Sequence, residues 1–401
     1  MGFFPLDEEL ELLPGKLTPK GHEQVVELSS WMPFERAVEM MGKFTGMKIS
    51  KIVSQRYTEA AGAIYAAMQK EEVEGLLKKM PRASVSPEKL QVSADGAMVP
   101  LLHGIWAEVK TLVIGDVQPA VLEKGEMVVH TRNLSYFSRK VSSQEFERLS
   151  LGEMHRRGVE NAKAVAAVMD GAEWEQSYID YHCPRAVRIL DFAHAADHIN
   201  QVGEYLYGEH TDESKAWLKE RLHQLKYEGP ERLLKEIRRL KRKHPEAQPI
   251  TNNLAYLQKR EKQIQYPTFQ EQGWPIGSGI VESGNKLVVE ARLKGSGMHW
   301  AEQHVDPMLA LRNIICSNRW KEEWSKIEAG IRKQRFKKTE STQPKVITGN
   351  NALLLILNEK TNSEAHLSNV MAGSKKTKPN PWRNFKYGKA LYQPNENLPK
   401  I

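Results

Sequence analysis

The sequence predicts a mixed α/β fold whose sheet is interrupted by an α-helical insertion and preceded by a helical amino-terminal domain. Apolar residues recur at every third or fourth position over residues 18–80, whereas runs rich in valine and isoleucine begin at residue 89. Residues 193–265 are then charged and helix-like, without runs typical of strands. These changes of pattern divide the chain into its expected parts.

The amino-terminal domain is expected to cover residues 1–85. Two of its helices flank the short turn TGMKI at residues 45–49, and the second begins near Ser50. Helices joined by a short turn that contains glycine are typical of helix-turn-helix DNA-binding regions. An ordinary antiparallel pair of helices has the same pattern, so both interpretations stay open. The side chains expected to contact DNA are Lys51, Gln55 and Arg56.

Residues 86–200 are expected to form the first part of the core, which contains a five-stranded mixed sheet. Three strand-like runs with short links predict an antiparallel meander. They read KLQVSAD, WAEVKTLVIGDV and MVVHTRNLSYFS. A polar helical stretch, an apolar run ending at Asp170, another helix and a strand ending at Asp191 follow. These later strands need crossover connections, which predicts parallel pairing beside the meander.

The remainder of the chain divides into three expected parts. Residues 201–271 form an α-helical insertion, and residues 272–338 complete the core and add carboxy-terminal helices. Residues 339–401 are polar and rich in proline and asparagine, which is typical of a loosely ordered tail. One short apolar element is expected within that tail, at residues 352–357.

The charge of the chain favours a polyanionic partner. Lysine and arginine total 58 against 50 acidic residues, for a net charge of +8. The excess is concentrated in two basic runs, at residues 232–244 and 332–338. Solvated helix faces would produce the same runs, so composition alone leaves both interpretations open.

Cysteine content and apolar runs indicate an intracellular protein. Cys183 and Cys316 are the only cysteines, and neither belongs to a pair with the spacing of a zinc site or a disulfide framework. The amino terminus lacks the basic region and cleavage site of a signal peptide. The longest apolar run, residues 352–357, is too short to span a bilayer. We therefore expect a cytoplasmic protein with no membrane partner.

Two aspartates occupy matching positions in the sheet region. Asp95 and Asp170 each follow an apolar run, and each precedes Gly-Ala. An Asp-Gly pair often merely ends a strand in a turn. However, the first and fourth strands lie side by side in a ribonuclease H-like sheet, which would bring these two carboxylates together. Such a pair can bind Mg²⁺, which takes oxygen ligands and shares its remaining positions with phosphate.

A third carboxylate would complete a two-metal site, in which the ions activate the attacking oxygen and stabilise the leaving one. Glu282 is the expected third residue, because it lies in the first turn of a helix that follows a glycine-rich turn. The alternative is a surface ion pair with Lys286, four residues later on the same helix face.

Several motifs together resemble those of a known family, the DDE transposases of bacterial insertion sequences, on the Mutator-like side and closest to the Kra-type group. In chain order they are FFPLDEELELLPGKLTP, SADGAMVPL, WAEVKTLVIGDV, MDGAEW, ILDFAHAADH, GSGIVESGNKLVVEARLKGSGMHW and NPWR. The motifs extend over nearly the whole chain, which makes the resemblance more specific than an isolated acidic triad.

The resemblance implies a ribonuclease H-like catalytic core in which Asp95, Asp170 and Glu282 are the catalytic, metal-binding residues. The implied cofactors are two Mg²⁺ ions, for which Mn²⁺ can substitute. The implied activity is hydrolysis at transposon ends followed by transfer of the 3′-hydroxyl end into target DNA. Double-stranded DNA is therefore the expected partner, with a homodimer or larger assembly located at the nucleoid.

The same resemblance implies supporting roles for other residues. Asp191 and His194 match a D-x-x-H element and are expected to support the site, although Asp191 is also the rival of Asp170 as second metal ligand. An ordinary Asp/His pair is the alternative. Three basic residues follow Glu282 and are expected to hold DNA phosphates near the metals: Lys286, Arg292 and Lys294.

One departure from the family motivates a second hypothesis. Related transposases often carry a Cys-rich segment ahead of FFPLDE, whereas Met-Gly directly precedes that motif here. The alternative function is therefore a truncated or domesticated DNA-binding protein that derives from a transposase and has no catalytic activity.

Overall fold

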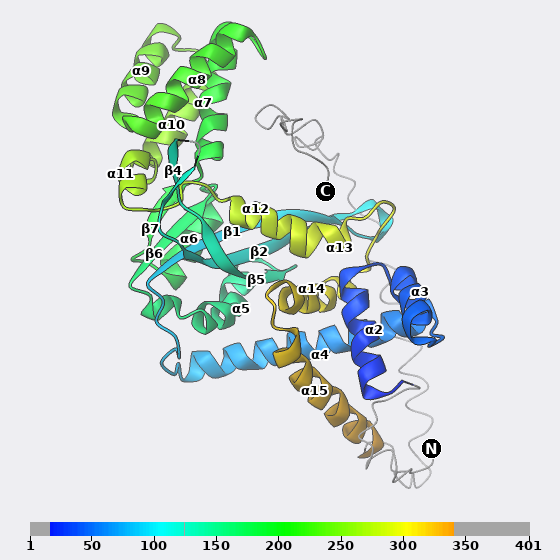
Figure 1. Ribbon diagram of the computed structural model, residues 1–401. Helices are drawn as coiled ribbons and strands as arrows, with labels where there is room; N and C mark the ends of the chain where they lie inside the picture. The colour runs from blue at the N-terminus through cyan, green and yellow to red at the C-terminus, as the bar shows by residue number, and fades with distance from the viewer. Residues whose placement is uncertain (1–16, 124, 341–401) are drawn as a thin grey trace, which may run out of the picture. The chain divides into compact units, whose positions relative to one another are not determined.

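The computed structural model describes residues 17–123 and 125–340 (Figure 1). Its side chains are described up to Lys333. The chain divides into two units after Thr339, and the first unit is described below. Residues 341–401, which hold nearly all of the predicted tail and its apolar element, lie outside the described residues, as does most of the FFPLDE motif.

A five-stranded mixed sheet forms the centre of the first unit, which confirms the predicted α/β class. Its order is β5-β2-β1-β6-β7, with antiparallel pairing of β1 with β2 and β2 with β5 and parallel pairing of β1 with β6 and β6 with β7. The strands are β1 (Lys89–Pro100), β2 (Trp106–Val117), β5 (Thr131–Arg139), β6 (Ala164–Met169) and β7 (Val187–Leu190). A separate ribbon pairs β3 (Val121–Glu123) with β4 (Glu126–Val128).

The first strand is longer than the sequence predicted. Asp95 was expected to end it, but β1 continues to Pro100. The extension occurs because β1 stays paired with β2 along its whole length, from Leu90↔Asp116 to Pro100↔Trp106. Its pairing with β6 stops at Val92↔Ala167, so Asp95 lies on a strand supported from one side only.

The amino-terminal and carboxy-terminal helices pack together on one face of the sheet. These helices are α2 (Pro19–Trp31), α3 (Phe34–Thr45), α4 (Lys51–Lys78), α14 (Glu302–Cys316) and α15 (Trp320–Glu340). The side chains of Thr18 and Ser50 cap α2 and α4 by accepting from backbone N–H groups. Their apolar faces share a core with Ala97 and Val99 of β1.

The opposite face of the sheet is covered by α5 (Ser143–Arg156) and α6 (Glu173–His182), which share a core with Leu90, Val92 and Ala94. Successive residues of a strand point to opposite faces. Odd-numbered positions of β1, including Asp95, therefore face the side where α14 lies. Short 3₁₀ turns occur at Leu102–Gly104, Val159–Asn161 and Glu261–Gln263.

The helical insertion leaves the sheet directly after β7 and shares a core with residues of β6 and β7. Its helices are α7 (Phe192–Tyr207), α8 (Asp212–Tyr227), α9 (Pro230–Lys243), α10 (Gln248–Lys259) and α11 (Tyr266–Glu271). The chain then returns through residues 272–278 to α12 (Gly279–Gly284), a π-helical segment (Asn285–Glu290) and α13 (Ala291–Leu293), which lie along the sheet (Figure 1). The insertion therefore separates β7 from the helix that carries Glu282.

Candidate metal centre

The register of the sheet brings Asp95 and Asp170 together. Strands β1 and β6 pair from Lys89↔Ala164 to Val92↔Ala167. Continued at the same offset, this register sets Asp95 opposite Asp170, which directly follows β6. Asp170 Oδ1 accepts from the backbone N–H of Ala172 at 2.8 Å, which fixes the turn after the strand. The two matching Asp-Gly positions of the sequence therefore meet at one level of the sheet.

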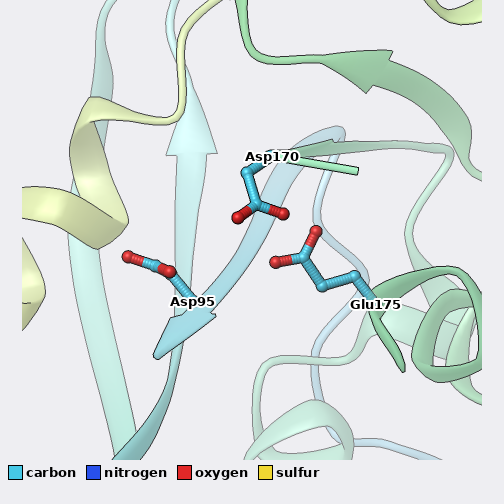
Figure 2. A group of neighbouring side chains, drawn as sticks. All are labelled: Asp95, Asp170 and Glu175. Carbon is cyan, nitrogen blue, oxygen red and sulfur yellow. The ribbon is translucent and has the colours of Figure 1, made fainter. Parts of the chain in front are cut away.

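A third carboxylate joins this pair, and it comes from α6 rather than from α12. Ligand oxygens of Asp95, Asp170 and Glu175 all lie within 4.8 Å of one another (Figure 2). Glu175 lies in the first turn of α6, and its Oε2 accepts from the backbone N–H of Gly171 at 3.0 Å. We call these three residues the acidic cluster.

Burial makes the negative charge of the acidic cluster costly. It raises the pKa of Asp95 to about 6, with the backbone N–H of Gly96 opposing the rise and the charge of Asp170 adding to it. Burial also raises the pKa of Glu175 to about 10, and the charge of Asp170 is the next cause. A divalent cation would offset this repulsion. Three convergent carboxylates suit a hard cation that prefers oxygen ligands.

Glu282 is not a member of the acidic cluster. Its Oε1 accepts from Lys286 Nζ at 2.6 Å, and its side chain is 54% exposed. The structure thus shows the ion pair that was the alternative for this residue. The same helical segment nevertheless reaches the cluster through Asn285, whose Nδ2 donates to Asp95 Oδ2 at 3.0 Å. Glu282 lies one turn before Asn285 and thus on the same helix face.

Asp191 organises the backbone beside the acidic cluster. The pairing Met169↔Leu190 of β6 and β7 sets Asp191 beside Asp170. Its Oδ2 accepts from the N–H of His194 at 3.3 Å, which caps α7, and its Oδ1 accepts from the N–H of Ser278 at 3.0 Å. Burial raises the pKa of this carboxyl group. Both oxygens thus hold backbone groups of the insertion's entry and exit.

His194 points into an aromatic group of the insertion. Its ring lies 5.2 Å from that of His198 and 6.0 Å from that of Tyr256, measured between centroids. The backbone N–H of His194 donates to Asp191 Oδ2 in the cap of α7, so the main chain of His194 joins the two residues. An ordinary Asp/His pair of side chains was the alternative interpretation for them.

The predicted DNA-contacting residues fall into different environments. Lys51 and Arg56 are exposed on the first turns of α4, whereas Gln55 is half-buried and donates to Glu59 at 2.8 Å. Lys294 pairs with Glu290 at 2.6 Å on the helical segment that follows Glu282.

The prediction that Arg292 contacts DNA phosphate is wrong. Its side chain is 1% exposed, and its Nε donates to the carbonyl of Ser29 at 2.9 Å. The guanidinium also lies over the rings of Phe34 and Trp300. Arg292 therefore joins α2 to the segment after Glu282 and cannot reach a phosphate from this position. Its position after Glu282 suggested a phosphate contact, but the tertiary fold buries it.

Glu175 and Asn285 were missed by the sequence reasoning. Glu175 shares the buried face of α6 with Tyr178 and Ile179, three and four residues later. An acidic residue on the apolar face of a helix is uncommon unless it has a partner. That periodicity was the signal which could have identified Glu175. Asn285 carried no comparable signal, because its role depends on a contact with β1.

Comparisons with known proteins assign neither a family nor a function to this chain. No family model matches the chain, and the search of curated proteins finds no match. Along residues 17–123 and 125–340, no helix is both long and apolar enough to cross a membrane.

Proposed function

We propose that this chain is a metal-dependent DNA transposase that hydrolyses DNA at transposon ends and transfers the freed 3′-hydroxyl end into target DNA. The observation that carries the proposal is the convergence of Asp95 and Asp170 from the first and fourth strands of the five-stranded sheet. This placement is the one expected in a ribonuclease H-like core. The motifs that resemble Kra-type transposases support the same function.

The residues present suit Mg²⁺, with Mn²⁺ able to substitute. Asp95 and Asp170 supply carboxylate oxygens from rigid elements, and Glu175 has a buried oxygen without a hydrogen-bond donor in the described part of the chain. When bound, such ions supply Lewis-acid chemistry that stabilises charge on the attacking and leaving oxygens of a phosphodiester. We propose Glu282, on α12, as a further catalytic acidic residue that faces bound DNA.

The surrounding residues hold the carboxylates in place. Asn285 fixes one oxygen of Asp95, and the backbone N–H of Ala172 fixes one oxygen of Asp170. Asp191 joins the start of α7 to the turn before α12, so it sets the distance between the insertion and Glu282. Preorganised groups of this kind raise rates because little reorganisation remains to be made during reaction.

Exposed cations provide the proposed contacts to duplex DNA. Lys51 and Arg56 lie on α4 after the short turn that begins at Gly46, whose φ of 71° ends α3. Contacts from such residues to phosphate position the duplex and weaken as salt rises. Joining two transposon ends to one target calls for a homodimer or larger assembly, which we propose at the nucleoid.

The test uses the purified protein, an end duplex taken from any inverted repeats found beside the reading frame, and Mg²⁺ or Mn²⁺. Asp95→Asn, Asp170→Asn and Glu282→Gln are each expected to abolish cleavage and joining while leaving DNA binding intact. Glu173→Gln is the matched control, since its side chain is 88% exposed close to the same loop. Normal cleavage by the Asp95 or Asp170 variant would contradict the proposal. DNA binding without any cleavage by the unaltered protein would favour the non-catalytic alternative.

A further inference from the structure

The geometry points to Glu175 as a third protein ligand of the divalent cation held by Asp95 and Asp170. This inference rests on the proposed function in one respect, which is that the acidic cluster binds a cation. It goes further because it assigns the third ligand of the DNA-free protein to a residue of α6, and separates that role from the role of Glu282.

The first support is the burial of the Glu175 side chain. The residue is 0% exposed, and its Oε2 is held by the N–H of Gly171. Its Oε1 is also buried and meets no hydrogen-bond donor among the residues described. Figure 2 shows the carboxylate directed at that of Asp170, with Asp95 beside them. A buried carboxylate oxygen without a donor costs free energy unless a cation, or a proton shared with Asp170, partners it.

The second support is distance. Two oxygens bound to one Mg²⁺ at about 2.1 Å each lie at most about 4.2 Å apart. The candidate oxygens of Asp95, Asp170 and Glu175 already lie within 4.8 Å of one another. Side-chain rotations that move each oxygen by about 1 Å would therefore bring one oxygen of each residue to a common ion. Carboxylates from β1, the end of β6 and α6 supply three ligands, and water or phosphate would fill the rest.

The third support is the contrast with Glu282. That carboxylate is half-exposed and already paired with Lys286. An exposed ion pair contributes little free energy and is easily exchanged for another partner. Glu282 is thus suited to act once DNA is present, whereas Glu175 lies in the cluster before DNA arrives. Glu175 and Glu282 are therefore expected to differ in how much each contributes to metal affinity in the DNA-free protein.

The test is Mn²⁺ binding to the full chain in the absence of DNA, measured by titration calorimetry and by the paramagnetic resonance signal of free Mn²⁺. Glu175→Gln is expected to weaken binding by about 10-fold or more, equivalent to about 1.4 kcal/mol. Glu282→Gln and the control Glu173→Gln are expected to bind as the unaltered protein does. Asp95→Asn is the positive control for loss of the site.

The Glu175→Gln variant also distinguishes a metal-binding role of Glu175 from a packing role. Glutamine keeps the shape of Glu175 and an oxygen for the N–H of Gly171, so the metal-free variant is expected to unfold at or above the temperature of the parent. Unchanged Mn²⁺ affinity in Glu175→Gln overturns the inference and leaves the proposed function standing. Failure of the unaltered protein to bind Mn²⁺ overturns the metal site, and the proposed function with it.

Discussion

Tyr256 of α10 donates a hydrogen bond from its hydroxyl group to the backbone carbonyl of Asp170 at 2.6 Å. The neighbouring Arg260 packs its guanidinium on the Tyr256 ring, 3.7 Å from the centroid, and bonds the carbonyl of Gly171. The helical insertion therefore holds the loop that carries one metal ligand of the proposed site. The position of the insertion and the geometry of the acidic cluster are coupled through these two side chains.

Tyr256→Phe is expected to weaken Mn²⁺ binding and lower the cleavage rate, each by roughly 10-fold, because the partly buried carbonyl of Asp170 loses its donor and the Asp170 loop loosens. Binding to an end duplex should not change. The matched control is Tyr205→Phe on α7, because Tyr205 is about half exposed. Equal Mn²⁺ affinity and cleavage in the two variants would show that the hydroxyl of Tyr256 does not position Asp170.

Gly171→Ala is expected to lower the free energy of unfolding by about 1–3 kcal/mol. Gly171 has a φ of +87°, and a Cβ there would lie 2.6 Å from Arg260 Nε and 2.7 Å from Tyr256 Oη. Gly104→Ala is the control, because Gly104 has a φ of +74° with open space around it. Urea denaturation of both variants separates steric exclusion from backbone strain. If Gly171→Ala loses no more free energy of unfolding than Gly104→Ala, the side chains of Arg260 and Tyr256 move aside for the methyl group.

Asp191→Asn is expected to keep Mn²⁺ affinity within about 3-fold of the parent, because asparagine retains one oxygen to accept from a backbone N–H group. Cleavage should fall but persist, since the turn before α12 loses part of its anchor. The comparison with Asp170→Asn, in metal-binding and cleavage assays run together, decides between the two candidates for second ligand. Complete loss in Asp191→Asn with activity in Asp170→Asn would reverse the assignment.

Acid is expected to destabilise the amino-terminal helices through His22. The His22 ring stacks on Tyr57 with centroids 4.3 Å apart, and its nitrogens have no partner in the described regions. Burial lowers the pKa of His22 to about 4. The unfolded chain therefore binds the proton more tightly, so this contribution to stability is present above about pH 6.5 and is lost as the pH falls towards about 4.

The magnitude of the His22 effect is up to about 3 kcal/mol, since one unit of pKa corresponds to about 1.4 kcal/mol. His22→Phe keeps a ring against Tyr57 and removes the titrating group. Urea denaturation at several pH values between about 4 and 7 should show a smaller loss of stability in the variant than in the parent. Identical pH profiles of the parent and His22→Phe would show that groups other than His22 cause the acid sensitivity.

Local sequence patterns predicted most of the fold. The change from helical periodicity to runs rich in valine and isoleucine located β1, β2 and β5, and the charged stretch after Asp191 forms the helices α7 to α11. Such patterns arise from neighbouring residues that must face one core, so they can be recognised without tertiary contacts. The extent of β1 was underestimated, because its second half is stabilised by cross-strand pairing with β2 that turn residues do not reveal.

The sequence by itself determined that Asp95 and Asp170 follow equivalent apolar runs, and the strand arrangement of a ribonuclease H-like sheet led us to expect them side by side. Only the tertiary structure decided which other groups meet them. It brings Glu175 from α6 and Asn285 from the segment after α12, pairs Glu282 with Lys286, and buries Arg292. The reason is physical: periodicity reports which face of an element is buried, whereas the partners on that face are set by packing between distant segments.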